Sequence, residues 1–375
     1  MSSDPGLVAV VGGGVIGLSV AWCLADAGYP VALIDPAPAE GASWVAGGML
    51  APVTESWPGE DDVLALGSAS LRRWPSFAER LARHGGDPGL RTEGTLVVAL
   101  DAADAATLDV LADHLRGLGR EVDRCTGREL RGLEPTIGPR VRSGLSVPGD
   151  LAVDNRALLR ALRSAAERCG VRFVAARARS VRSGIVELAD GTTVECSTAV
   201  IAAGAWSREL HPGLAGVVRP VKGEILRLRA RRGALPAPLR TIRAHVESRQ
   251  VYLVPRDDGE LVLGATQYEA GFDTDVTVGG VRDLLADAEQ VLPGIGEYAL
   301  VETAAGLRAS SRDNLPLLGW LEPGVLAATG HHRNGLLLAP VTAEAVLAIL
   351  RAEDLPAHVR AADPARFSPD GGGTR

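Results

Sequence analysis

The sequence predicts an α/β protein with two domains, one built on a parallel sheet and discontinuous in the chain, the other an α+β domain built on an antiparallel sheet. Residues 8–35 form the pattern of a strand, a glycine turn, a helix and a second strand, which is typical of a βαβ unit. From residue 219 onward, apolar and polar residues alternate, with a hairpin turn at 257–259, which indicates antiparallel strands. The length of 375 residues suits two domains of ordinary size.

The overall composition excludes several classes of partner. The net charge is -7, so we expect no nucleic-acid or anionic-membrane surface. The chain has no apolar run long enough to span a membrane and no basic region ahead of its first apolar segment, so we expect a cytoplasmic protein without a signal peptide. The four cysteines lack metal-ligand spacing. We therefore expect reduced thiols and no metal site.

The glycine turn in residues 8–35 predicts a dinucleotide site in a Rossmann-like domain. Gly12, Gly14 and Gly17 have the G-x-G-x-x-G spacing: the first allows a tight turn, the second lets the backbone approach a pyrophosphate, and the third lets helix and strand pack closely. The pyrophosphate is expected at the helix N-terminus, where free N–H groups favour negative charge. Asp35 ends the second strand, where a carboxylate can accept hydrogen bonds from ribose hydroxyls.

The segment after Asp35 favours a flavin over a nicotinamide as the second half of the dinucleotide. Nicotinamide enzymes normally continue from the second strand into another crossover helix. Here the chain is expected to continue as a loop, whose small residues let the backbone run beside a large, flat ring system. The small residues are Gly41, Ala42, Ser43, Ala46, Gly47 and Gly48.

The middle of the chain supplies helices and strands that complete the first domain. Apolar periodicity predicts helices over residues 62–84, 101–118 and 155–169. A turn and a strand are expected in 89–100, and turns at 183–184 and 190–191 join further strands. Residues 198–206 predict a buried parallel strand that ends in small residues, and open parallel sheets bind ligands at that edge.

The last third continues the second domain and then returns to the first. After the alternating strands, residues 279–292 predict a helix, and residues 305–350 predict a loop with the sequence A-G-L-R, a strand, a glycine turn and a closing helix. We expect the first domain to comprise residues 1–85, 147–215 and 302–364, the second to comprise residues 86–146 and 216–301, and residues 365–375 to be a disordered tail.

Motifs spread over residues 6–350 resemble those of the D-amino-acid-oxidase-like flavoproteins, and within them the glycine oxidases of thiamine biosynthesis. The small-residue loop after Asp35 and a G-H-x-R-N-G turn near the end together select this branch. The motifs are GGGVIG, GASWVAGGMLAP at 41–52, RPVKGEIL at 219–226, VYLVPR at 251–256, LVLGAT at 261–266, AGLRASSRDNLPLLG at 305–319 and ATGHHRNGLLLAP at 328–340.

The resemblance implies a noncovalent FAD, with its adenosine diphosphate on residues 8–35 and its isoalloxazine ring against Ser43 and residues 47–49. It implies a backbone contact of Ala178 with the adenine, and a turn at 331–337 whose N–H groups stabilise negative charge near the flavin pyrimidine. No cysteine follows Cys196, which excludes the covalent attachment of sarcosine oxidases. The implied cofactor-binding residues are Gly12, Gly14, Val15, Ile16, Gly17, Asp35, Pro36, Ala42, Ser43, Gly47, Gly48, Met49, Ala178, Gly204, His331, His332, Arg333, Asn334, Gly335, Leu336 and Leu337.

For the substrate, the resemblance implies three contacts. Arg308 of the A-G-L-R motif would bind a carboxylate, the backbone carbonyl of Arg333 would accept a hydrogen bond from the amine, and Tyr252 would lie near the carboxylate. From the residues alone, Arg308 can also be a surface residue in a loop and Tyr252 an ordinary strand residue. Gln250 and Gln267 replace apolar or histidine residues of better-known relatives, so we expect a more polar pocket.

The implied reaction is the oxidation of a small amino acid, most simply glycine, by hydride transfer to the flavin, with O₂ reduced to H₂O₂. The imine would hydrolyse to glyoxylate and ammonia or supply the thiazole of thiamine, with a thiazole synthase as pathway partner. A homo-oligomer is expected. Two alternatives stay open: an oxidase or dehydrogenase of sarcosine or a small D-amino acid, and an FAD-binding protein without turnover.

Overall fold

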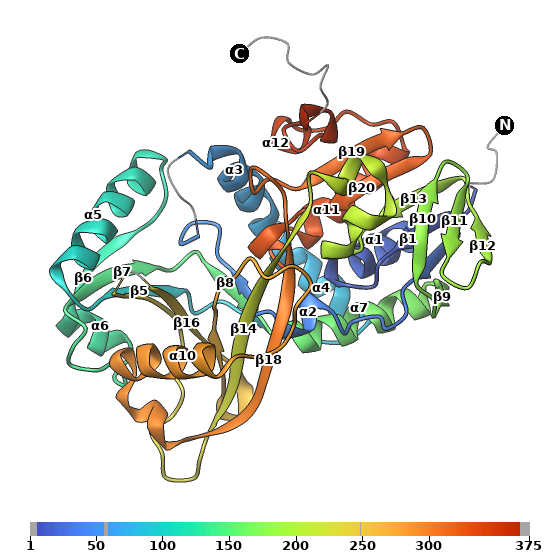
Figure 1. The fold of residues 1–375 in the computed structure, drawn as a ribbon. Coiled ribbons are helices and arrows are strands. Elements are labelled where there is room, and N and C mark those ends of the chain that lie inside the picture. Colours follow the sequence, from blue (N-terminus) through green and yellow to red (C-terminus); the bar gives the residue numbers. More distant parts are fainter. Residues whose placement is uncertain (1–5, 56–58, 248, 368–375) are drawn as a thin grey trace.

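The computed structural model describes residues 6–55, 59–247 and 249–367. Two large sheets lie next to each other, and the long strands β14 (Arg219–Ala230) and β18 (Tyr298–Ser310), at one edge of the second sheet, lie between them (Figure 1). One large sheet is mostly parallel and the other mostly antiparallel. The predicted α/β architecture with two kinds of sheet is therefore confirmed.

The mostly parallel sheet has six strands, with the glycine-turn strand β1 near its centre. β1 pairs in parallel with β2 and with β13, and only β19 runs antiparallel to its neighbour β20. β1 is buried along its whole length, as its four apolar residues predict. The strand order is β19 (Leu317–Glu322), β20 (Val325–Thr329), β13 (Thr198–Ile201), β1 (Val8–Val11), β2 (Val31–Ile34) and β9 (Arg172–Val174).

Helices and a small sheet cover the two faces of the parallel sheet. On one face, α1 (Val15–Asp26) packs against α7 (Asn155–Arg168) and α11 (Ala339–Leu350) in one apolar cluster. On the other face, a second apolar cluster joins the sheet to β10 (Ala178–Arg182) and β11 (Ile185–Leu188), which pair with β12 (Thr193–Glu195). Burial on both faces accounts for the apolar residues of the central strands β1 and β2.

The second large sheet has eight strands and is antiparallel except where β15 pairs with β5. Helix α10 (Val278–Val291) covers one face, and α5 (Ala102–Gly117) covers part of the other. Asp101 caps α5 by accepting a hydrogen bond from the Asp104 N–H. The strand order is β18, β14, β17 (Glu260–Gly264), β16 (Arg249–Pro255), β15 (Thr241–Val246), β5 (Thr95–Ala99), β7 (Ser143–Val147) and β6 (Asp123–Thr126).

Shorter elements complete the fold. β3 (Met49–Leu50), β8 (Leu151–Val153) and β4 (Leu90–Arg91) form a small sheet. The short helices are α2 (Ala42–Val45), α3 (Asp61–Leu71), α4 (Trp74–His84), α6 (Gly127–Leu133), α8 (Ser207–Leu210), α9 (Pro212–Ala215) and α12 (Ala357–Arg360). Within the described ranges, no helix is both long enough and apolar enough to cross a membrane.

Two predicted elements were wrong in part. The helix predicted over 62–84 is two helices, α3 and α4, because Pro75 lacks an N–H and fits only in the first turn of a helix. The A-G-L-R sequence, predicted as a loop, lies in strand β18, which pairs with β14 along its whole length. Small residues are needed there because a Cβ atom on Gly306 would press against α2 at Val45 and Ala42.

The end of the chain also differs from its prediction. Residues 364–367 form a 3-10 helix, and Arg366 Nε donates to Asp313 Oδ2 at 2.8 Å. The predicted disordered tail therefore begins too early by at least three residues, because this ion pair and hydrogen bonds to backbone carbonyls order Arg366. Residues 368–375 of the predicted tail lie outside the described residues. The predicted domain boundaries stay a prediction.

Candidate active site

A cavity of about 670 Å³ runs from the glycine turn after β1 to the antiparallel sheet. Its volume lies within the roughly 300–1,000 Å³ usual for ligand pockets. At one end it is lined by the glycine turn and the ends of β2 and β13, and at the other by β14, β15, β16 and β18. The predicted dinucleotide site and the predicted substrate residues therefore share one cavity.

The glycine turn has the geometry that its spacing predicts. Gly12 has a φ of 111°, and a Cβ atom there would overlap with the carbonyl of Ala202. A Cβ atom on Gly17 would overlap with the carbonyl oxygen of Gly12, so this glycine allows α1 to pack on the turn. A Cβ atom on Gly14 would approach only the Ser43 hydroxyl, at 3.3 Å. Gly14 therefore leaves the N-terminus of α1 open to the cavity.

Two polar side chains shape the cavity beside this turn. Asp35 accepts hydrogen bonds from the N–H groups of Gly13 at 2.6 Å and Ala37 at 2.7 Å, so its carboxylate fixes the turn as well as lining the cavity. Ser43 Oγ accepts a hydrogen bond from the Val15 N–H at 3.1 Å. Ser43 thus lies at the start of α1, where its hydroxyl satisfies an N–H that the helix leaves free. Its predicted contact with the isoalloxazine ring stays a prediction.

A buried polar network holds the loop around Gly47. Arg256 Nη2 donates to the Gly47 carbonyl at 2.6 Å and to Asn155 Oδ1 at 3.2 Å, and Arg227 Nη2 donates to the same Asn155 oxygen at 3.1 Å. Asn155 Nδ2 donates to the Ser43 carbonyl at 2.9 Å. Burial lowers the pKa of Arg256 to about 10. The network ties the cavity loop to the antiparallel sheet, because Arg227 belongs to β14 and Arg256 follows β16.

Most of the other predicted cofactor residues line the cavity, and three do not. Gly17, Asn334 and Leu337 do not contribute to its wall. Leu337 faces the core instead, where its carbonyl accepts a hydrogen bond from Trp74 Nε1 at 2.9 Å. The other predicted cofactor residues that line the cavity are Val15, Ile16, Pro36, Ala42, Gly48, Met49, Ala178, Gly204, His331, His332, Arg333, Gly335 and Leu336.

The two histidines of the C-terminal glycine turn are held neutral. Burial lowers the pKa of His331 to about 3, and His331 Nε2 is hydrogen-bonded to Thr342 Oγ1 at 3.0 Å. Burial and then the neighbouring Arg333 and Arg308 guanidinium groups lower the pKa of His332 to about 3. Neither imidazole therefore carries a positive charge at neutral pH.

The predicted substrate residues Tyr252 and Arg308 lie together at the antiparallel sheet. Arg308 Nη1 donates to the carbonyls of Thr266 at 3.2 Å and Lys222 at 3.4 Å. The guanidinium lies over Gly223, where a Cβ atom would overlap with it, and Tyr252 lies over Gly47 in the same way. Burial raises the pKa of Tyr252 and lowers that of Arg308. The two glycines thus make room for the two predicted substrate-binding side chains.

Arg333 lies at the same end of the cavity but has acidic partners of its own. Its Nη2 atom donates to the backbone carbonyl of Glu55 at 2.7 Å, and its Nε atom lies 3.5 Å from the Glu55 carboxylate. Its Nη2 atom also lies 3.5 Å from Glu60. The guanidinium is thereby held by Glu55 and Glu60. The predicted substrate contact through the Arg333 backbone carbonyl stays a prediction.

Sequence reasoning missed three polar residues at the substrate end: Glu55, Arg243 and His245. On β15 and β16, Arg243 pairs with Tyr252 and His245 pairs with Gln250, so these four side chains share one face. A signal was present, because Arg243 and His245 alternate with buried apolar residues along β15. The register between the two strands was what the sequence did not reveal.

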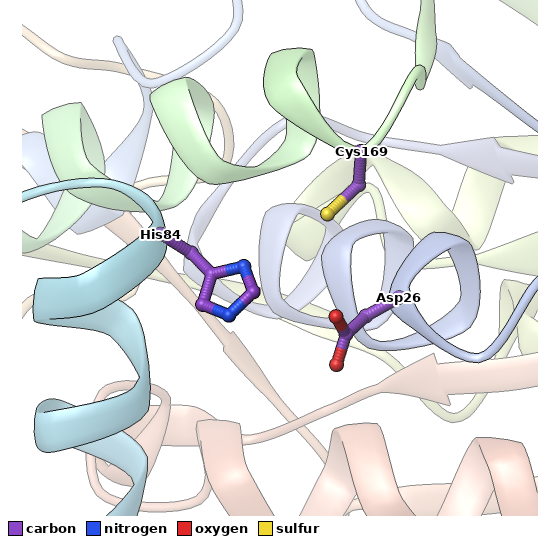
Figure 2. A group of neighbouring side chains, drawn as sticks. All are labelled: Asp26, His84 and Cys169. Atoms are coloured by element: carbon purple, nitrogen blue, oxygen red, sulfur yellow. The ribbon is translucent and has the colours of Figure 1, made fainter.

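Outside the cavity, the fold brings together three potential metal ligands that the sequence spacing did not indicate. Asp26 at the end of α1, His84 at the end of α4 and Cys169 after α7 point toward one another (Figure 2), with ligand atoms within 4.8 Å. Arg80 Nη2 lies 3.6 Å from Asp26 Oδ2, so this carboxylate already has a cationic partner. We assign no metal to this group.

The cavity fits an extended dinucleotide such as FAD. The open N-terminus of α1 at Gly14 offers a place for the pyrophosphate. The small residues Gly47 and Gly48 border the cavity where the ring system is predicted. No crossover helix follows β2 before the cavity wall, and the single turn of α2 leaves the cavity long enough to reach the antiparallel sheet.

Known proteins share this fold and about a third of the aligned residues. The FAD dependent oxidoreductase family matches residues 8–349. The chain is 35% identical over 347 residues to the glycine oxidase of Geobacillus kaustophilus, which covers 89% of this chain and 90% of that protein. It superposes on the crystal structure of glycine oxidase from Geobacillus kaustophilus with a TM-score of 0.89 and 31% identity, covering 98% of this chain and 100% of that one.

Two further relatives carry thiamine-related names. The putative thiamine biosynthesis oxidoreductase ThiO of Rhizobium etli is 32% identical, over 90% of this chain and 94% of that protein. The bifunctional protein ThiO/ThiG of Synechocystis sp. is 33% identical over 96% of this chain but 54% of its own length, so this chain spans about half of that relative. The family match over most of the chain agrees with the glycine turn and with the cavity. The chain belongs to the FAD dependent oxidoreductase family.

Proposed function

We propose that this chain is a glycine oxidase, an FAD-dependent amino acid oxidase that converts glycine, O₂ and water to glyoxylate, ammonia and H₂O₂. The observation that carries the proposal is the Arg308 guanidinium in the cavity wall. Among the described residues, its hydrogen-bond acceptors are the backbone carbonyls of Lys222 and Thr266. Its charge is thus left for a carboxylate. The similarity to glycine oxidases over most of the chain supports glycine as the substrate.

In this proposal, FAD extends along the cavity and supplies the two-electron redox chemistry. The pyrophosphate would lie at the N-terminus of α1 beside Gly14 and Ser43. The ring system would lie against residues 47–49, which Arg256 holds through the Gly47 carbonyl. Ala178 and Gly204 would contact the cofactor through their backbones, because both border the cavity.

The protein residues would orient the amino acid for this chemistry. Arg308, with Tyr252 beside it, would bind the carboxylate, and the backbone carbonyl of Arg333 would accept a hydrogen bond from the amine. Because His331 and His332 are uncharged at neutral pH, neither would repel the positive charge of an incoming ammonium group. The rate enhancement would come mainly from holding the α-carbon in position.

The proposal is tested by measuring H₂O₂ release from the purified holoenzyme with glycine, sarcosine, D-alanine and D-proline. Glycine is expected to give the highest kcat/KM. The absence of peroxide with all four amines would refute the proposed oxidase activity. If glycine bleaches the flavin without oxygen but yields no peroxide, the protein is a dehydrogenase. If no amine bleaches the flavin, it is an FAD-binding protein without turnover.

A second candidate, an oxidase of a small D-amino acid with a polar side chain, is favoured by one observation. Gln250 and Gln267 both line the substrate end of the cavity, and their amide groups can hydrogen-bond a hydroxyl on a side chain that glycine lacks. A kcat/KM for D-serine at least tenfold above that for glycine would support this alternative.

We further propose a role in thiamine biosynthesis in the cytoplasm. The thiamine-related names of two relatives support the pathway, and four free cysteines suit a reducing compartment. A thiazole synthase as pathway partner and a homo-oligomer are part of the same proposal. Loss of growth without thiamine after deletion of the gene, restored by the gene, tests the pathway role.

A further inference from the structure

A buried group of charged side chains lies beside the predicted substrate contacts. The Glu55 carboxylate lies between two guanidinium groups: Arg243 Nη1 donates to Glu55 Oε1 at 2.5 Å, and Arg333 Nε lies 3.5 Å from Glu55 Oε2. The side chains of Glu55 and Arg243 are only 10% and 11% exposed. All three residues line the same cavity as Arg308 and Tyr252. The carboxylate is therefore part of the wall that a substrate meets.

Glu55 is ionised in this position. Burial by itself works to raise its pKa, but the nearby Arg243 and Arg333 guanidinium groups outweigh burial and hold the pKa below its usual value. Among the described residues, Glu55 is the ionic partner of Arg243, whose Nη1 atom also contacts Met49 Sδ at 3.7 Å. Without the Glu55 charge, Arg243 would be an uncompensated buried cation facing the cavity.

The position of Arg243 follows from the sheet register. Arg243 on β15 is the direct partner of Tyr252 on β16, and side chains paired in this way have Cβ atoms roughly 5 Å apart. A substrate whose first carboxylate lies on Arg308 beside Tyr252 would thus bring a second carboxylate, a few bonds away, near Arg243. In the native protein, Glu55 already fills that position.

We propose that Glu55 is a specificity-determining residue that acts as a built-in second carboxylate. By occupying both Arg243 and Arg333, it restricts the enzyme to amines with one carboxylate. This inference rests on the proposed amino acid oxidase function and deepens it. Its removal creates a site for dicarboxylic amines, of which iminodiacetate is the simplest with a glycine unit at each end.

The new substrate would undergo the same reaction. One C–H bond of iminodiacetate breaks and its electron pair passes through FAD to O₂, which gains two protons and becomes H₂O₂. Water then adds to the resulting imine, and the C–N bond breaks. Each turnover consumes one O₂ and one water and releases one glyoxylate, one glycine and one H₂O₂. Initial rates are needed, because the glycine released is itself a substrate.

The test compares Glu55→Ala with wild type and with the matched variant Glu60→Ala. Glu60 also lies 3.5 Å from Arg333 but is not part of the cavity wall. The measured quantity is kcat/KM for iminodiacetate divided by kcat/KM for glycine. We expect this ratio to rise about tenfold or more in Glu55→Ala, the scale of one charge-assisted hydrogen bond. It should change less than about threefold in Glu60→Ala.

A double variant shows whether Arg243 is responsible. In Glu55→Ala/Arg243→Met, the ratio should return to within about threefold of the wild-type value, because the cation that binds the second carboxylate is gone. Glu55→Gln serves if Glu55→Ala does not fold, since it removes the charge and keeps the size. An unchanged ratio in a Glu55 variant that retains FAD and oxidises glycine overturns the proposal, as does an equal rise in Glu60→Ala.

A binding measurement separates this inference from the proposed function. Iminodiacetate is titrated into each oxidised holoprotein while the flavin absorbance spectrum is recorded. If wild type does not oxidise glycine, the function proposal fails, yet the Glu55 inference still predicts an apparent Kd for iminodiacetate about tenfold or more lower in Glu55→Ala than in wild type. Equal Kd values would overturn it.

Discussion

The two ends of the cavity are built in different ways. At the dinucleotide end, the glycine turn needs the absence of side chains at Gly12 and Gly17. At the substrate end, the wall consists of particular charged and polar side chains, among them Arg308, Arg243 and Glu55. The centre of the first end, the glycine turn at residues 12–14, is one short segment of chain, and residues from 34–43, 177–179 and 202–205 complete its wall. The second depends on strands from several parts of the chain.

This difference determines how each end responds to substitution. Adding a methyl group at the dinucleotide end should disrupt binding or folding, because the added atom collides with backbone that cannot move away. Removing a charge at the substrate end should leave the fold and the cofactor in place and change catalysis or specificity. The following predictions test this contrast.

The largest effect is expected for Gly17→Ala. The added Cβ atom overlaps with the Gly12 carbonyl, so we expect a loss of about 3 kcal/mol or more in the free energy of unfolding and little bound FAD. The measurements are thermal unfolding and the flavin content after purification. As the control, Gly279→Ala in α10 has no atom within 4 Å of the new Cβ and should be neutral or slightly stabilising. Full FAD content in Gly17→Ala would contradict the expectation that an added methyl group at the dinucleotide end disrupts cofactor binding.

At the other end, Arg308→Ala should lower kcat/KM for glycine by about 100-fold or more while the FAD content stays unchanged, because only the charge that binds the carboxylate is lost. Steady-state peroxide assays and the flavin spectrum measure the two effects. Arg229→Ala, an exposed arginine of β14 paired with Glu260, is the matched control and should keep wild-type kinetics. Unchanged kinetics in Arg308→Ala would contradict the proposal that Arg308 binds the substrate carboxylate.

Asn155 joins the two ends, so its substitution should affect both. In Asn155→Ala, Arg227 and Arg256 lose their shared acceptor, and we expect the free energy of unfolding to fall by about 2 kcal/mol, with weaker FAD binding. Asn155→Asp keeps the acceptor and should lose less stability. Urea unfolding and FAD titration measure the two properties. Equal stability of wild type and Asn155→Ala would show that the network does not couple the ends.

The last effect is similar in size to that of Asn155→Ala and appears only as a change with pH, at Asp150. Burial raises the pKa of Asp150 from 3.8 to about 7, while Thr54 Oγ1 donates to it at 2.8 Å. Between pH 3.8 and 7 the folded state keeps a proton that the unfolded state has lost, so the stability contributed by Asp150 falls as pH rises and levels off above about 7.

The amide side chain of Asp150→Asn cannot titrate, so this variant should not lose stability through position 150 as the pH rises. We expect the difference in the free energy of unfolding, variant minus wild type, to grow by about 2 kcal/mol between pH 5 and 8. Urea unfolding of both proteins at several pH values measures this difference. A difference that is constant with pH would show that Asp150 does not titrate in this range.

Much of the dinucleotide end could be predicted from the sequence because its determinants are local. The G-x-G-x-x-G spacing predicted the roles of Gly12 and Gly17, and the structure confirms both steric roles. The small residues after β2 favoured a flavin over a nicotinamide, and the family match confirms FAD. Pro75 divided the helix predicted over 62–84, a local signal that the periodicity of the surrounding residues concealed.

The substrate end could be predicted only in part, and through resemblance. Arg308 and Tyr252 were predicted as neighbours, and the structure brings them together, but their contacts with the substrate stay predictions. Arg243 and Glu55 were missed because they are 188 positions apart in the chain. No local pattern links a strand residue to a carboxylate that far away.

The sequence by itself determined the glycine turn, the kind of dinucleotide it suits and most of the strands and helices, because each depends on residues close together in the chain. Only the tertiary structure decided that Arg243 lies beside Tyr252 and that Glu55 lies between Arg243 and Arg333. Cross-strand neighbours are fixed by the register of whole strands, and a shift of one residue would turn Arg243 to the opposite face of the sheet.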